Sequence, residues 1–245
     1  MTVAQEISTV PGLEVERDGA VLTVRLDSPD GNLMTMDMCD ALAGILTAPP
    51  EGVHMLVLAG AGDSFCLGRE RTAATPDDLP GEVRRLIAVN DALASTPLVT
   101  VARVHGDAAG FGVGLAALCD VAVATRAARL SFPEVRINLA PALVLAWLPA
   151  MVGRRAAFWL TASGAPVSGD EAVAIGLLNQ VVDDVDALDA VISEKVGVLL
   201  AAQPRVHTEI RAMLRSVESL SESQAYELAS DRLVLGSLRR LQTGN

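Results

Sequence analysis

Alternating apolar and polar residues predict the first strand and the helix after it. In Val21–Leu26 every second residue is apolar, which places Leu22, Val24 and Leu26 on one face of a strand. A stretch rich in methionine and alanine follows, and it predicts a helix over residues 33–47. The N-terminal part of the chain therefore begins a strand-then-helix pattern with one buried strand face.

Three short apolar runs predict further strands. They are Met55–Leu58, Leu98–Ala102 and Val121–Ala124. Continuous apolar runs of this length are typical of parallel strands that are covered on both faces. Helical or loop segments lie between them, so we expect an α/β fold. The segment Arg71–Gly81 is polar and contains prolines, and we expect it to be a mobile loop.

The pattern from Asp186 onward predicts helices only. Leu188, Ile192, Val196 and Leu199 recur at helical spacing and form one apolar stripe. We therefore divide the chain into a core domain, residues 1–185, and a helical C-terminal region, residues 186–245.

Two further helices are expected in this region. Pro204 separates the first helix from the second, and Ser221 with Gln224 has the spacing of a capping box that starts the third. The third helix carries apolar residues on one face, at Leu228, Leu235 and Leu238. Such a face must pack on the core or on another subunit.

Composition limits the classes of partner. At 245 residues the chain can form one large α/β domain with an appendage. It has no signal-peptide pattern and no apolar run near the roughly 18 to 20 residues that cross a bilayer, so we expect a soluble, cytoplasmic protein. A net charge of −11 disfavours nucleic acid and anionic membranes. An anionic ligand would need local arginines or backbone N–H groups.

Neither cysteine nor histidine suggests a metal or redox site. The cysteines are odd in number, lack any C-x-x-C pair and are expected to be reduced and mostly buried. The histidines are equally scattered, and a lone histidine in an apolar segment is usually structural. These residues are Cys39, Cys66, Cys119, His54, His105 and His207.

Two glycine-bearing turns follow predicted buried strands, at Gly60–Glu70 and Gly106–Gly114. Glycine lets a backbone approach a ligand, and the first N–H groups of a following helix can bind an anion. Either turn by itself is equally consistent with a purely structural role.

A dinucleotide-binding fold is the alternative interpretation of the second turn. Gly110 and Gly112 supply the first two glycines of its fingerprint, but Leu115 stands where the third is required. The acid about twenty residues further on, Glu134, follows a proline and does not end a second predicted strand. This fold is therefore the less favoured one.

A carboxylate in apolar surroundings is the third feature that suggests a catalytic role. Glu134 follows Ser131-Phe132-Pro133 and precedes the apolar stretch Leu139–Trp147, in which Trp147 could line a pocket or pack in the core. Apolar surroundings favour the neutral form of a carboxyl group, which suits proton transfer near neutral pH. The alternative is a solvated surface glutamate.

In order and spacing, the three features resemble the pattern of the crotonase (enoyl-CoA hydratase/isomerase) superfamily. The matching segments are Phe65–Glu70, Gly106–Gly114 and Phe132–Glu134. Asn32, Cys119-Asp120 and Glu171–Val182 are similar as well. The resemblance covers residues 12–185, and the helical tail matches in type only.

The resemblance implies a spiral of strand-strand-helix units and a helical region that forms a homotrimer or a dimer of trimers. It also implies a coenzyme A (CoA) thioester as substrate, with no separate cofactor. The thioester carbonyl would meet the backbone N–H groups of Arg69 and Phe111, which would stabilise a developing enolate. The CoA path would be lined by Cys66, Leu67 and Gly68. Gly110 would let the backbone approach the ligand.

Departures from the family pattern bear on the reaction. Gly114 stands where the family's hydratases carry their first catalytic glutamate, whereas Glu134 matches the second. Phe111 and Asn138 replace usual glycines, and Ser28 replaces a frequent basic residue near CoA.

The single carboxylate favours one reaction. Hydration in the similar hydratases uses two carboxylates, whereas moving a proton between the α and γ carbons of an enoyl thioester needs one base. We therefore expect double-bond isomerisation with Glu134 as the proton shuttle. The alternatives are hydration with an unrecognised second group, other enolate chemistry, and a CoA-thioester binding protein without turnover.

Overall fold

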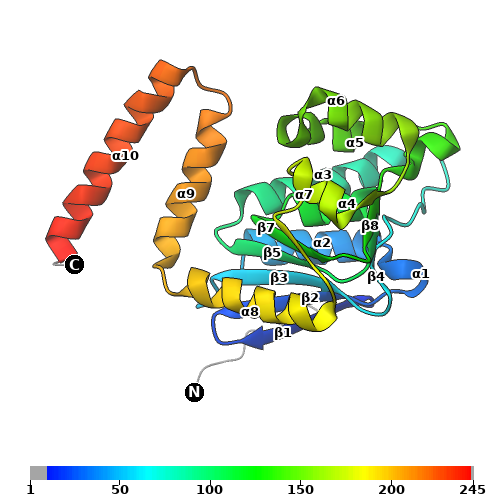
Figure 1. Ribbon diagram of the computed structural model, residues 1–245, viewed down its shortest axis with the longest axis horizontal. Helices are drawn as coiled ribbons and strands as arrows, with labels where there is room; N and C mark the ends of the chain where they lie inside the picture. Colours follow the sequence, from blue (N-terminus) through cyan, green and yellow to red (C-terminus); the bar gives the residue numbers. More distant parts are fainter. Residues whose placement is uncertain (1–9, 244–245) are drawn as a thin grey trace. The chain divides into compact units, whose positions relative to one another are not determined.

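The computed structural model describes residues 10–243, which contain two β-sheets (Figure 1). The larger sheet has six strands in the order β1-β2-β3-β5-β7-β10. β1 is antiparallel to β2, and every other neighbouring pair is parallel. The strands are β1 Leu13–Asp18, β2 Val21–Leu26, β3 Met55–Gly60, β5 Val99–Val104, β7 Val121–Thr125 and β10 Gln180–Val182.

The smaller sheet takes the second strand of each repeating unit, in the order β4-β6-β8-β9. Its strands are β4 Ser64–Cys66, β6 Asp107–Ala109, β8 Arg129–Ser131 and β9 Val167–Ser168. The chain passes from β3 to β4, from β5 to β6 and from β7 to β8, and helices follow each pair. This repetition confirms the predicted spiral of strand-strand-helix units. It excludes the dinucleotide-binding fold, in which strand order reverses within one sheet.

Helices connect and cover the sheets. They are α1 Pro29–Asn32, α2 Met36–Thr47, α3 Leu79–Ser95, α4 Phe111–Ala117, the 3₁₀ helix η1 Pro133–Ile137, α5 Ala142–Leu145, α6 Leu148–Ser163, α7 Gly169–Ala174, α8 Val185–Leu200, α9 Pro204–Val217 and α10 Glu222–Thr243. The helix predicted from residue 33 begins at Met36, because the hydroxyl of Thr35 caps it by accepting the N–H of Met38. None of these helices is both long and apolar enough to span a membrane.

The larger sheet is buried on both faces, as its apolar runs predict. Leu22, Val24 and Leu26 are fully buried in the main core, which includes residues of α2 and α3. On the opposite face, Met55 and Val57 belong to a second cluster that contains Leu188 of α8. Figure 1 shows α8 lying along the sheet. The predicted stripe on α8 therefore completes the core.

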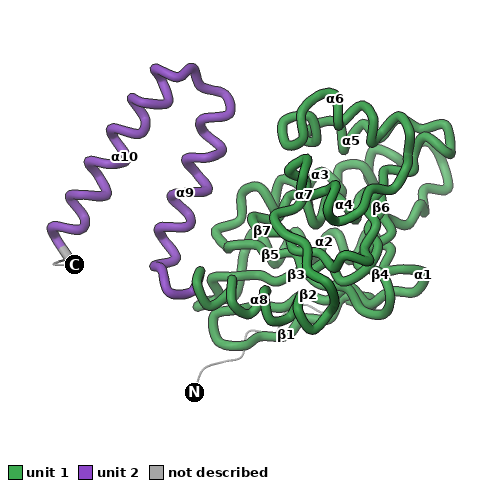
Figure 2. Tube along the Cα trace, viewed as in Figure 1, with its two compact units in different colours: residues 1–199 green, residues 200–245 purple. Residues whose placement is uncertain are grey.

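The chain forms two compact units, residues 1–199 and residues 200–245 (Figure 2). α8 lies within the first unit, although it follows the predicted domain boundary at residue 185. In the second unit, the guanidinium of Arg239 on α10 pairs with the carboxylate of Glu209 on α9. Ser221 and Gln224 form the predicted capping box at the start of α10.

Candidate active site

A cavity of about 570 Å³ gathers most of the predicted site residues. Leu67, Gly68 and Arg69 from the first glycine-bearing turn line it together with Gly110 and Phe111 from the second. Glu134 from η1 and Trp147 from the start of α6 also line it. The first and second turns and the Phe-Pro-Glu segment are therefore brought to one place.

A buried asparagine holds the first turn in position. The Nδ2 of Asn32 donates to the carbonyl oxygens of Ala61 and Ser64, each at 2.8 Å, and the residue is only 3% exposed. Its Oδ1 accepts the N–H of Ser28 at 3.1 Å. One side chain therefore satisfies several backbone groups of the turn that leads into β4. The family resemblance singles out this residue, and the structure shows its physical role.

The backbone of Arg69 leaves its N–H available. Met34 and Arg69 form an isolated parallel bridge. The N–H of Met34 donates to the carbonyl oxygen of Gly68, and the N–H of Glu70 donates to the carbonyl oxygen of Met34. In this arrangement the N–H of Arg69 is outside the bridge and is directed to the other side of the strand. Arg69 also lines the cavity.

The side chain of Arg69 is neutralised by a buried carboxylate. Its Nη1 lies 2.7 Å from Oε2 of Glu82 on α3. The other oxygen of Glu82 accepts the N–H and the hydroxyl of Thr72, at 3.0 and 2.8 Å. Hydrogen bonds to the carboxylate hold the pKa of Glu82 below its ordinary value. The Thr72 hydroxyl has the largest effect, and Arg69 has a smaller one. This cluster ties Arg69 and Thr72 to α3.

Two glycines let the second turn pack closely against η1 and the first turn. Gly110 has a φ of +51°, and a Cβ there would lie 2.8 Å from Oε1 of Glu134. A Cβ at Gly112 would lie 2.0 Å from the carbonyl oxygen of Cys66. No other residue type fits either position without moving its neighbours. Phe111, between them, opens α4, where backbone N–H groups have no intrahelical acceptor.

Cys66 lies apart from the other predicted site residues. Its side chain is fully buried, and Sγ donates to the carbonyl oxygen of Gly68 at 3.3 Å. Burial raises the pKa of this thiol to about 12. Cys66 does not line the cavity, whereas its neighbours Leu67 and Gly68 do. Cys66 therefore lies behind the cavity wall, against Gly112 of the second turn.

Glu134 points a carboxyl group into mostly apolar surroundings. Its Oε2 is buried and has no hydrogen-bond partner within residues 10–243. The cavity wall around it includes Leu139, Leu143 and Val144. The protein therefore leaves this carboxyl oxygen without a hydrogen bond, on a side chain that borders the cavity.

Trp147 occupies the space beside Gly114. A Cβ at Gly114 would lie 3.5 Å from Cζ2 of the indole, in ordinary van der Waals contact. The indole also makes an edge contact with Phe132, with ring centroids 6.4 Å apart. Both Gly114 and Trp147 line the cavity, so this part of its wall is apolar.

Further polar residues of the cavity have no motif in the sequence. Asn90 of α3 lines it, and its Oδ1 is buried without a partner in the described part of the chain. Arg71 and Arg136 also line it, and Nη2 of Arg136 donates to the carbonyl oxygen of Gly164 at 3.0 Å. Only the packing of α3, η1 and the 66–71 segment reveals these residues.

The remaining cysteines and histidines have structural surroundings. Cys39, Cys66 and Cys119 are buried, as predicted, and none is in a disulfide within residues 10–243. His105 donates the N–H of Nε2 to the carbonyl oxygen of Gly62 at 2.8 Å. Residues 10–243 contain no cluster of three metal-binding side chains.

Comparison with known proteins identifies the family. Residues 16–234 match the family model described as enoyl-CoA hydratase/isomerase. The chain is 31% identical over 195 residues to 1,2-epoxyphenylacetyl-CoA isomerase of Escherichia coli, with 75% of this chain and 74% of that protein covered.

Solved structures agree with the family model. The enoyl-CoA hydratase of Mycobacterium smegmatis has a TM-score of 0.87 and 31% identity, covering 93% of this chain and 91% of that one. A putative enoyl-CoA hydratase of Thermobifida fusca in complex with CoA has a TM-score of 0.83 and 26% identity, covering 95% of each chain. The present chain belongs to the enoyl-CoA hydratase/isomerase family of enzymes, which has the crotonase fold.

Proposed function

We propose that this acyl-CoA enzyme isomerises the double bond of an enoyl-CoA thioester, with Glu134 as the proton shuttle. One observation carries the proposal. Among the described residues that line the cavity, Glu134 is the only carboxylate. A single base can move one proton between two carbons of the same substrate, whereas hydration must also activate a water molecule.

Two backbone donors are proposed to bind the thioester oxygen. The N–H of Arg69 is outside the bridge with Met34, and the N–H of Phe111 is in the first turn of α4. Because both residues line the cavity, both donors can be directed at one oxygen. Donors that are fixed before the reaction stabilise the enolate oxygen by roughly 3–4 kcal/mol each.

The proposed reaction conserves all atoms of the substrate. The Glu134 carboxylate removes a proton from the α-carbon of a 3-enoyl thioester, and the negative charge moves to the thioester oxygen. The carboxylic acid so formed returns the same proton to the γ-carbon, and the double bond then lies between the α and β carbons. The unpartnered Oε2 of Glu134 supports this role, because no protein group competes for its proton.

The wall around Gly114 supports isomerisation over hydration. Gly114 has no side chain to hold water, and the indole of Trp147 fills the adjacent space. An apolar surface there offers no hydrogen bond to a nucleophilic water molecule. The cavity therefore lacks a second acid or base at the position where the similar hydratases carry one.

The CoA part of the substrate is proposed to run along Leu67 and Gly68, with Cys66 packed behind them and Gly110 allowing close approach. The match to a T. fusca structure that contains CoA supports CoA as part of the substrate. Arg71 and Arg136 bring positive charge to the cavity of a chain whose net charge is −11, which favours an anionic ligand. No separate cofactor is needed for the proposed proton transfer.

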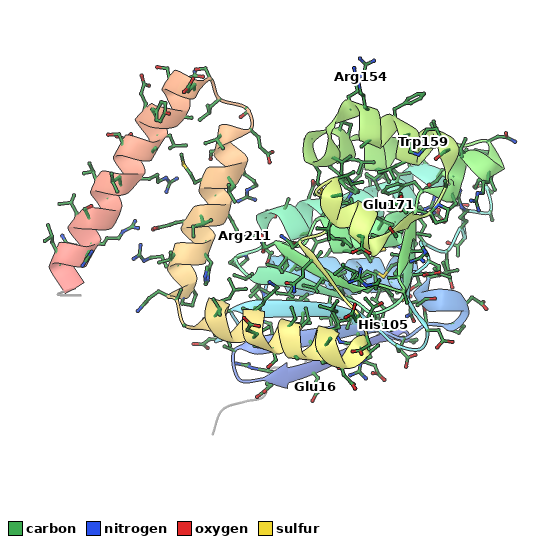
Figure 3. All side chains as sticks on the ribbon, in the orientation of Figure 1. Glu16, His105, Arg154, Trp159, Glu171 and Arg211 are labelled. Carbon is green, nitrogen blue, oxygen red and sulfur yellow. The ribbon has the colours of Figure 1, made fainter. Side chains whose placement is uncertain are left out.

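Self-association, as a trimer or a dimer of trimers, is proposed as well. α6 exposes Phe158 and Trp159, at 69% and 65%, and Figure 3 shows Arg154 extending outward from the same helix. α9 exposes Ile210 and Leu214, at 51% and 62%. Large apolar side chains exposed along helices are typical of surfaces that bind another chain.

Glu134→Gln tests the proposed reaction. The amide keeps the size of the side chain but cannot accept the proton, so isomerisation of 3-enoyl-CoA should fall about 10²- to 10⁴-fold. Exchange of the α-hydrogen in deuterated water should fall with it. Glu70→Gln is the matched control, because Glu70 is next to the cavity-lining Arg69 in the sequence but does not itself line the cavity. Its variant should keep both activities.

Three outcomes would contradict the proposal. Unchanged exchange in Glu134→Gln would remove Glu134 from the mechanism. Efficient hydration of 2-enoyl-CoA by the wild type would favour hydratase chemistry instead. Binding of CoA thioesters with neither exchange nor conversion would indicate a binding protein without turnover.

A further inference from the structure

One polar side chain interrupts an otherwise apolar helix face in the cavity wall. Val83, Leu86 and Asn90 of α3 all line the cavity, and their spacing places them on one side of the helix. Leu139, Leu143 and Val144 line the cavity as well. A leucine at position 90 would continue this surface, so the amide of Asn90 needs a separate explanation.

The protein does not satisfy the amide of Asn90. Its Oδ1 is buried and accepts no hydrogen bond from any residue in the described range 10–243. A buried polar atom without a partner lowers stability, and native proteins rarely leave one unless a ligand or water provides the partner. Asn90 lines the cavity in which Glu134 also lies. The missing partner is therefore expected from the molecule that fills the cavity.

The chemistry of the amide defines the partner. Rotation by 180° about the last side-chain bond exchanges the oxygen and nitrogen of the amide, so this position can accept or donate. A hydroxyl group can do both and matches either orientation. A carboxylate matches only the donor orientation of the amide, because an ionised carboxylate accepts hydrogen bonds and donates none. A purely hydrocarbon chain would leave the amide unsatisfied.

We propose that Asn90 is a specificity residue that hydrogen-bonds a hydroxyl group on the acyl chain of the substrate. The proposal deepens the proposed function, on which it rests, because it assumes that the acyl chain of a CoA thioester fills this cavity. The enzyme would then prefer hydroxylated acyl-CoA thioesters over unsubstituted ones of equal length. Sites that pair a buried polar group with a substrate hydroxyl discriminate against the analogue that lacks it.

Binding of saturated thioesters tests this preference without requiring turnover. We suggest calorimetry with an unsubstituted acyl-CoA and with a series of acyl-CoA thioesters of the same length that carry one hydroxyl at successive positions. The wild type should bind at least one hydroxylated member about tenfold more tightly than the unsubstituted one. Asn90→Leu should lose this preference and bind the unsubstituted thioester at least as well as the wild type does.

Thermal unfolding of the same variant separates substrate recognition from a structural role. Asn90→Leu removes an unsatisfied polar atom, so its melting temperature should equal or exceed that of the wild type. A clear decrease would show that the amide has a structural partner, and it would overturn the proposal. Asn90→Ala removes the amide without adding bulk, and it should lose the hydroxyl preference in the same way.

The binding data also separate the two proposals. Equal affinity of the wild type for all members of the series, or a preference that survives in both variants, would overturn the role of Asn90 and leave the proposed function intact. A wild type that binds no acyl-CoA would overturn both proposals.

Discussion

At the scale of single residues, the position of Arg69 depends on Glu82. The carboxylate is buried, pairs with the guanidinium of Arg69 and accepts two hydrogen bonds from Thr72. Its pKa is lowered in the fold, so folding favours the ionised form. The stabilisation is complete above the ordinary carboxyl pKa of 4.5 and is lost as pH falls towards the lower folded value.

Glu82→Gln should therefore destabilise the protein in a pH-dependent way. At pH 7 we expect a loss of about 1–3 kcal/mol in the free energy of unfolding, because a buried charged group loses its partner. The difference from wild type should narrow below about pH 4.5, where the carboxylate of the unfolded wild type becomes protonated. Urea unfolding at pH 7 and pH 4 measures both values.

Glu14→Gln is the matched control for this experiment. Glu14 pairs with Arg25 at 3.4 Å, but both side chains are largely exposed. Its loss should change the free energy of unfolding by less than about 1 kcal/mol. Equal effects of the two substitutions would show that the Glu82 cluster does not stabilise the turn around Arg69.

Residue-level predictions from the sequence succeed where a local pattern defines the role. Glu134 stands out because a carboxylate follows a proline in an apolar stretch, and the structure places it in the cavity. Asn90 and Glu82 lie in a polar-apolar helix without a motif, so nothing local distinguishes them from surface residues. Their roles depend on which other segment α3 faces.

At the scale of elements, α4 and the start of α6 together form an apolar part of the cavity wall. A carboxylate introduced on α4 would face this contact. Gly114 on α4 faces the indole of Trp147. In Gly114→Glu alone, the new Cβ would contact the indole at 3.5 Å, which restricts the directions of the carboxylate and adds no space for water, so we expect no gain in hydration. Gly114→Glu combined with Trp147→Ala provides both a second carboxylate and space for water.

The double variant should therefore hydrate 2-enoyl-CoA at least about tenfold faster than the wild type, because a second acid-base group becomes available. The rate of 3-hydroxyacyl-CoA formation measures the gain. Trp147→Ala alone is the control and should show no such increase. A matching increase in that single variant would mean that space, and not the missing carboxylate, limits hydration.

Element prediction from the sequence depends on length. The buried strands β2, β3, β5 and β7 contain continuous or alternating apolar runs, and these runs predict them correctly. The strands of the smaller sheet have at most three residues, which is too short for a period of two to be recognised. The sequence pattern does not distinguish α3 and α6 from the loops around them. The segment 71–81, expected to be a loop, contains the start of α3 at Leu79.

At the scale of the whole molecule, self-association is the property to test. Ile210 and Leu214 are exposed on one side of α9, one helical turn apart. Ile210→Glu with Leu214→Glu should reduce the assembly from multiples of three chains to single chains, because charges would be buried in an apolar interface. Light scattering coupled to gel filtration measures the mass.

Ser223→Glu is the control for the added charge. Ser223 is exposed in the first turn of α10, where a negative charge is favourable. This variant should keep the mass of the wild type. A wild type that elutes as a single chain, or an assembly that persists in the double variant, would contradict a role of α9 in association.

The sequence by itself determined the family, the fold class, the two glycine-bearing turns, the position of Glu134 and the absence of a carboxylate at Gly114. These features are local, because apolar periodicity, backbone conformation and short motifs are properties of neighbouring residues. Only the tertiary structure decided that Trp147 fills the space at Gly114 and that Asn90 lines the cavity without a partner. A cavity wall is built by segments distant in the chain, so its chemistry depends on packing between elements.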